Sequence, residues 1–136
     1  MKKERKNPLT KSFGYAFEGI LTGIRQERNM KIHCVAIILV TAAGTLFQIT
    51  AVEWCICLLL FALVAGLELV NTAVEAVVDL VTEEKKPLAK KAKDTAAGAV
   101  LFAAVISVFI GCIIFLPYLF GLVEKIFCPS EKKCLI

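Results

Sequence analysis

Long apolar stretches alternate with short charged segments along this chain. At 1.5 Å of rise per residue, residues 32–49, 54–81 and 95–123 are each long enough to cross about 30 Å of hydrocarbon. Only residues 50–53 separate the first two spans, which predicts a tight antiparallel pair of helices. Over residues 13–30, apolar side chains recur every three or four positions and polar ones fill the other side, which predicts an amphipathic helix along the membrane surface.

Composition agrees with this pattern. The chain has 136 residues, of which 58% are hydrophobic, more than a soluble domain of this length could bury. We expect an all-α membrane protein that forms one domain over residues 1–136, with an interfacial helix followed by three transmembrane helices. Residues 1–12 form a basic leader and residues 124–136 a tail. We expect no cleavable signal peptide, because no apolar core follows the leader directly.

The positive charges predict the orientation. Eight Lys and Arg residues precede Ile32, none lies between the first two spans, five lie in residues 82–94, and three follow Val123. By the positive-inside rule, the amino terminus and residues 82–94 face the cytoplasm, and the tail lies outside. We therefore expect a multi-pass protein of the cell membrane.

Four polar residues interrupt the second span on one side. At 100° per residue, Glu68, Asn71, Glu75 and Asp79 lie at about 0°, 300°, 340° and 20° on a helical wheel. Such groups are costly in lipid and mark functional sites. The predicted topology places this stripe between mid-depth and the cytoplasmic boundary, on the same side as Glu27. That arrangement suits a reaction between a lipid-dissolved and a water-dissolved partner, and a divalent cation would offset the crowding of three acids.

The remaining candidates have alternative interpretations. The lysines of residues 82–94 are explained equally well by anionic headgroups and by phosphate next to the acidic stripe. His33 is interpreted as a hydrogen-bonded structural residue. Cys128 and Cys134 lie in the tail and could form a disulfide there, whereas the four cysteines inside the spans are interpreted as small apolar side chains.

Residues 68–79, ELVNTAVEAVVD, resemble the signature of the prokaryotic diacylglycerol kinase family. That signature is Glu, any residue, aliphatic, Asn, Ser or Thr, Ala or Ser, aliphatic, Glu, two residues, aliphatic and Asp. Every position of this chain agrees with it. The string Ala92-Lys93-Asp94 is similar to a second short motif of the family, and the resemblance extends from Phe13 to about Leu119.

The resemblance implies a reaction and an assembly. Members of the family are homotrimers with sites shared between subunits, and they transfer the γ-phosphoryl group of MgATP to the primary hydroxyl of a membrane lipid. This chain contains no glycine-rich phosphate loop and no protein-kinase catalytic loop, so ATP and Mg²⁺ are expected only through the resemblance. No nucleic acid is expected among its partners.

The resemblance also implies roles for individual residues. Glu68 matches the proposed general base, and Glu27 and Glu75 match ligands of the metal and the nucleotide. Three further positions match nucleotide contacts: Tyr15, Lys93 and Asp94. Asn71 and Asp79 match supporting polar residues.

Two departures bear on the substrate. An arginine of the family's leader has no clear equivalent, Lys11 being the nearest, and Ala97 replaces a serine found in members that use diacylglycerol. Residues 28–33, RNMKIH, look like the Gram-positive branch, whose members phosphorylate undecaprenol. We therefore favour undecaprenol over diacylglycerol.

Two functions of other classes remain open from the residues alone. Carboxylates along one face of an oligomeric membrane protein could line a proton or cation channel. Residues 55–67 carry no ionisable group except two thiols, so the polar path would not continue outward. Alternatively, Glu68 and Asn71 could join helices by hydrogen bonds in a non-catalytic subunit.

Overall fold

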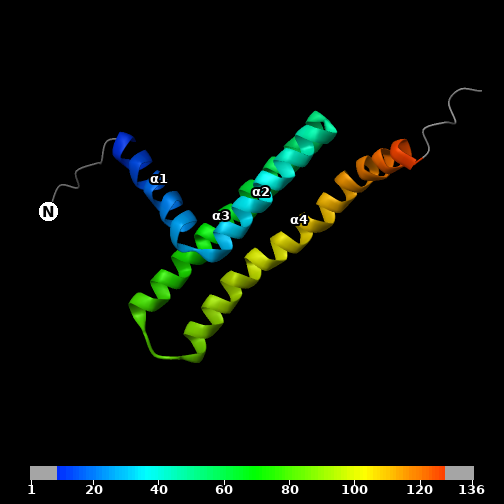
Figure 1. The fold of residues 1–136 in the computed structure, drawn as a ribbon. Helices are drawn as coiled ribbons and strands as arrows, with labels where there is room; N and C mark the ends of the chain where they lie inside the picture. Colours follow the sequence, from blue (N-terminus) through cyan, green and yellow to red (C-terminus); the bar gives the residue numbers. More distant parts are fainter. Residues whose placement is uncertain (1–8, 128–136) are drawn as a thin grey trace, which may run out of the picture.

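The computed structural model describes residues 9–127, which form four helices and no strand (Figure 1). They are α1 (Leu9–Gln26), α2 (Arg28–Phe47), α3 (Ala51–Val81) and α4 (Pro87–Phe127). Helices α2, α3 and α4 are long and apolar enough to cross a membrane. The expected all-α architecture with three candidate spans is confirmed. Cys128 and Cys134 lie outside the described residues, and so does their expected pairing.

The chain bends sharply between α1 and α2. A single helix was expected over residues 13–30, but α1 ends at Gln26 and α2 begins at Arg28. Glu27 between them has extended backbone angles, φ −86° and ψ 124°, and its amide donates to the carbonyl of Gly23 at 3.0 Å. Figure 1 shows α1 projecting away from the long axis that the other helices share. We call this bend the α1–α2 corner.

The turn between α2 and α3 is short and well capped. Gln48 adopts a left-handed conformation (φ 54°), which ends α2. The hydroxyl of Thr50 accepts from the amide of Glu53, and the amide of Thr50 donates to the Glu53 carboxylate at 2.7 Å. This reciprocal capping box starts α3 at Ala51, three residues before the expected span.

Helices α3 and α4 pack as a long antiparallel pair. At one end the hydroxyl of Tyr118 donates to the Glu53 carboxylate at 2.8 Å, and at the other end Lys93 Nζ lies 2.6 Å from Asp79 Oδ1. Almost the same number of residues separates these contacts along each helix, so the register is constant. The third span was expected to begin at residue 95, after a loop over residues 82–94 that contains Pro87. Pro87 instead opens α4, at the position where proline is best tolerated, and the loop shortens to residues 82–86.

Few side chains are buried in the single chain. The core cluster near the α2–α3 turn contains Ile49, Cys57 and Ile114, and the ring of Phe47 stacks on that of Tyr118 at 6.0 Å. Most large apolar side chains of the three spans are exposed. That distribution suits helices whose outer faces meet lipid tails or other helices.

Candidate functional site

Glu68 is the most deeply buried large side chain of the described residues. Only 1% of its surface is exposed, and neither carboxylate oxygen has a hydrogen-bond partner within residues 9–127. Its backbone carbonyl accepts from the hydroxyl of Thr72 at 3.0 Å, so only the side chain is unsatisfied. A buried carboxylate without a partner is costly, and such groups are found where function requires them.

Asn71 and Glu75 continue the polar stripe one and two turns further along α3. The Asn71 amide donates to Glu75 Oε1 at 3.0 Å, whereas the carbonyl oxygen of Asn71 is buried without a partner. Asn71 therefore holds the Glu75 carboxylate on the same face as Glu68, as the helical spacing predicted. Three buried polar atoms of this stripe remain free to bind a ligand.

The α1–α2 corner covers this part of α3. A Cβ atom added to Gly23 of α1 would lie 2.7 Å from Leu69 Cδ2, so the absence of a side chain allows α1 to approach next to Glu68. Met30 in the first turn of α2 is also buried. Protein, rather than lipid, therefore encloses the Glu68 carboxylate.

The lengths of α2 and α3 show where Glu68 lies along the helix bundle relative to the α1–α2 corner. Helix α2 has 20 residues and α3 has 31, and the two are joined by a short turn, so α3 extends about 16 Å past the start of α2. Figure 1 shows α3 and α4 continuing beyond the corner to the loop that joins them. Glu68 thus lies near the level of the corner. Glu75 and Asp79 lie on the projecting part, which we call the α3–α4 stalk (residues 70–100).

Lys93 and Asp94 face different neighbours on the stalk. Lys93 pairs with Asp79 across the two helices, and its side chain is half-buried. Asp94 lies 3.3 Å from Lys90 on the exposed side of α4. The structure therefore brings Lys93 to the polar stripe and directs Asp94 towards solvent.

Glu27 and Tyr15 come from the amino-terminal part of the chain. Glu27 is the residue at the corner and lies close enough to Glu68 for their charges to interact. Tyr15 is 60% exposed on α1, two turns before Gly23. Within one chain, Glu27 joins the stripe and Tyr15 does not.

Sequence reasoning missed one side chain of this site and gave another a different role. Asn29 and His33 of α2 both lie near the Glu68 carboxylate, although Asn29 does not reach hydrogen-bond geometry. Both are brought there by the bend at Glu27, which lies within the polar run of residues 25–29. Their spacing of four residues on one helical face was the only signal available.

Acidic groups suitable for a divalent cation meet near Glu68. Glu27 at the α1–α2 corner and Glu75 of α3 both lie near its carboxylate. Within residues 9–127, no cluster of three or more His, Cys, Asp or Glu side chains is close enough to form a complete metal site. Mg²⁺ commonly uses one or two carboxylates together with phosphate oxygens and water, so a pair of carboxylates fits a cation that arrives with a nucleotide.

Comparisons with known proteins agree with the signature. The family model described as "Prokaryotic diacylglycerol kinase" matches residues 14–115. Undecaprenol kinase of Bacillus subtilis is 48% identical over 120 residues, which cover 86% of this chain and 98% of that protein. A diacylglycerol kinase of Synechocystis is 43% identical over 115 residues, 84% of this chain and 66% of that protein. Diacylglycerol kinase of Escherichia coli is 29% identical over 106 residues, 78% of this chain and 87% of that protein.

Proposed function

Because this chain belongs to the prokaryotic diacylglycerol kinase family and is a lipid kinase, we propose that it phosphorylates undecaprenol with MgATP. The observation that carries the proposal is the Glu68 carboxylate, which is buried and unpartnered beside Glu27 and Glu75. The similarity to an undecaprenol kinase over almost that protein's whole length supports the choice of lipid. We therefore assign the chain as a kinase rather than as a proton or cation channel or a non-catalytic subunit.

Glu68 acts as the general base in this proposal. Its oxygens have no donor among residues 9–127, so the hydroxyl of a lipid alcohol would supply the missing hydrogen bond and then give up its proton. Burial by the α1–α2 corner excludes water, which would otherwise compete with the alcohol as acceptor of the phosphoryl group. Asn71 orients Glu75 through its amide.

The nucleotide binds along the stalk. Glu27 and Glu75 would hold Mg²⁺, which supplies charge neutralisation for the phosphates when bound. Lys93, now paired with Asp79, adds positive charge beside the same stripe, and we assign Asp94 and Tyr15 to nucleotide contacts. Phosphoryl transfer depends mainly on alignment and charge neutralisation, so these few residues are sufficient.

The proposed setting is the cell membrane, with the amino terminus and the stalk in the cytoplasm. Charge distribution supports this orientation, because Lys85, Lys86, Lys90, Lys91 and Lys93 all lie at the stalk end of the helix pair. We further propose a homotrimer. The exposed apolar faces of the spans and the exposed position of Tyr15 are consistent with a site that neighbouring subunits complete.

One assay tests the proposed function. Purified protein is incubated with MgATP in mixed micelles that contain undecaprenol, diacylglycerol or no alcohol, and phosphorylated lipid is measured. Undecaprenyl phosphate should form at the highest kcat/KM. Preference for diacylglycerol would transfer the assignment to the second candidate, which the 43% identical relative supports. ATP consumption that is independent of any alcohol would contradict both.

A further inference from the structure

Helix α4 extends beyond the ends of the other two spans. Tyr118 of α4 contacts Glu53 in the first turn of α3, so Tyr118 lies level with the α2–α3 turn. From there α4 continues to Phe127, which adds about 13 Å of helix at 1.5 Å per residue. Figure 1 shows this end of α4, in orange and red, standing apart from the other helices. We call residues 118–127 the α4 extension. It lies outside residues 14–115, which match the family model.

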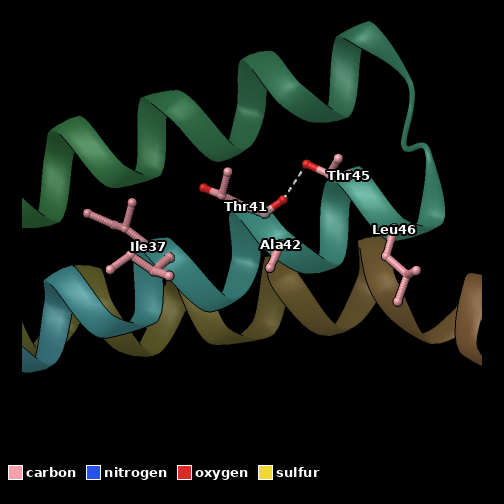
Figure 2. Close-up of a pocket in the computed structure, with 6 residues that line it drawn as sticks. Ile37, Thr41, Ala42, Thr45 and Leu46 are labelled. Atoms are coloured by element: carbon pink, nitrogen blue, oxygen red, sulfur yellow. Dashed lines mark hydrogen bonds between the residues drawn. The ribbon is translucent and has the colours of Figure 1, made fainter.

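The α2–α3 turn marks one boundary of the hydrocarbon layer. The 20 residues of α2 rise about 30 Å, which is the thickness of that layer. Figure 2 shows the outer face of α2 just before the turn, where Leu46 is exposed and the Thr45 hydroxyl donates to the carbonyl of Thr41 at 2.7 Å, as polar groups in contact with lipid require. Gln48 and Thr50 follow in the turn itself. A straight α4 extension would therefore cross the headgroup layer, which is about 5–7 Å thick, and enter water.

The α4 extension has one polar and one apolar side. At 100° per residue, its polar residues and its glycine fall within about 120° of a helical wheel, and its apolar residues fall within about 160° on the other side. The polar side carries Tyr118, Gly121, Glu124 and Lys125, and the apolar side carries Leu119, Phe120, Leu122, Val123, Ile126 and Phe127. This division is typical of a helix that lies in the plane of a membrane surface.

The apolar side points away from the rest of the chain. Tyr118 on the polar side reaches Glu53, so the polar side faces the α2–α3 turn. Phe120 and Phe127 on the apolar side are 62% and 80% exposed. If the extension bends outward, away from α3, its apolar side turns towards the hydrocarbon and its polar side towards water. An outward bend therefore gives each side the surroundings that it requires.

Pro117 directly precedes the extension and allows this bend. Proline has no amide proton, so the carbonyl of Ile113 one turn earlier lacks its usual helical donor. Sharp kinks in long helices are most often found at such positions. We propose that the α4 extension bends at Pro117 and lies in the headgroup layer of the leaflet opposite α1, with its apolar side on the acyl chains. The chain is then held at both membrane surfaces, and this inference does not depend on the proposed function.

A lipid surface fits the α4 extension better than a second copy of the chain does. The extension continues directly from a helix that is long and apolar enough to span the membrane, so lipid headgroups lie beside it in every subunit. Its apolar side is wider than the narrow seam along which two helices pair. Lys125 and Glu124 lie at the two edges of the polar side, from which their side chains extend to lipid phosphates and to water.

Photolabelling from lipid tests the depth of the extension. The full-length protein is reconstituted in phosphatidylcholine vesicles that contain one of two diazirine lipids, with the reactive group either next to the glycerol or at the end of an acyl chain. After photolysis, labelled peptides are identified by mass spectrometry. We expect the interfacial probe to label the α4 extension and the terminal probe to label only the spans. Labelling of the extension by the terminal probe, or by neither probe, overturns the proposal.

Two substitutions place the same charge on opposite sides of the extension. Val123→Glu adds it to the apolar side, whereas Gly121→Glu adds it to the polar side, where no atom lies within 4 Å of an added Cβ. We expect Val123→Glu to reduce interfacial labelling of the extension severalfold and Gly121→Glu to leave it unchanged. Labelling of the spans by the terminal probe shows that each variant is inserted normally. Equal loss in both variants, or no loss in Val123→Glu, overturns the proposed arrangement.

Discussion

The two halves of α3 each carry a carboxylate, and the two carboxylates have opposite surroundings. At the α2–α3 turn, Glu53 Oε2 accepts from the Thr50 amide, the Thr50 hydroxyl and the Tyr118 hydroxyl, at 2.7–2.8 Å. At the α1–α2 corner, Glu68 accepts from no described group. The first carboxylate contributes to the fold by capping a helix and joining it to its neighbour. Glu68 makes no such hydrogen bond within residues 9–127, so it does not stabilise the fold in this way. We therefore interpret Glu53 as a structural acid and Glu68 as a functional one.

The largest effect should follow from neutralising the unpartnered acid. Glu68→Gln removes the proposed base, so kcat for lipid phosphorylation should fall by roughly 10²–10⁴-fold. The thermal midpoint should stay the same or rise, because a buried charge without a partner no longer has to be accommodated. Phosphorylated lipid and thermal unfolding in detergent measure the two effects. Near wild-type turnover would show that Glu68 is not the base.

The next largest effect should follow from adding a side chain at the α1–α2 corner. Gly23→Leu places a side chain where a Cβ atom alone would lie 2.7 Å from Leu69 Cδ2, and overpacking of this kind costs about 1–3 kcal/mol. We expect a lower thermal midpoint and reduced lipid phosphorylation. Gly19→Leu, one turn earlier on α1, is the control, because no atom lies within 4 Å of its added Cβ. Equal effects of both variants would contradict the described packing of the corner.

Removing a hydrogen bond from Glu53 should have a smaller effect, and it should change stability rather than turnover. Tyr118→Phe removes one hydrogen bond to Glu53 and keeps the ring that stacks on Phe47. The free energy of unfolding should fall by about 0.5–1.5 kcal/mol while kcat remains unchanged. Unfolding in detergent and the lipid assay are compared in the same preparation. A loss of kcat larger than the loss of stability would show that the turn influences the distant site.

The ion pair of the stalk should matter least for stability. Asp79 and Lys93 are both partly exposed, so Asp79→Asn should change the free energy of unfolding by less than about 1 kcal/mol. Thermal unfolding provides the measurement, and Glu84→Gln, at a more exposed ion pair in the loop, is the control. A much larger loss would mean that this pair, rather than helix packing, sets the register of α3 and α4.

Much of this architecture could be predicted because it depends on local sequence. The apolar runs predicted α2 and α3 within a few residues, and the spacing of Glu68, Asn71 and Glu75 placed them on one face of α3. The capping box of Thr50 accounts for the earlier start of α3. These features follow from helical periodicity and from contacts between residues three or four apart.

The bend at Glu27 could not be predicted in the same way. No proline or glycine stands at that position, and the polar run of residues 25–29, RQERN, does not mark any one residue as the end of a helix. Its cause is tertiary, because α1 packs on α3 through Gly23 and Leu69, which come from distant parts of the chain. The proximity of Asn29 and His33 to Glu68 depends on that bend, so it could not be predicted from the sequence either. The start of α4 at Pro87 was missed because the expected span was drawn from the apolar run alone, whereas the helix extends back through the lysine-rich residues 87–94.

The unequal lengths of α2 and α3 have a consequence for the end of the catalytic cycle. Phosphorylation converts a neutral alcohol into a dianion, and a dianion is very costly inside hydrocarbon. With Glu68 as the proposed base, the new phosphate would form at the foot of the stalk, near the level where α1 leaves the bundle. A phosphate formed there would need to move only a short way along the stalk to reach water, while the tail of the product stays in the lipid.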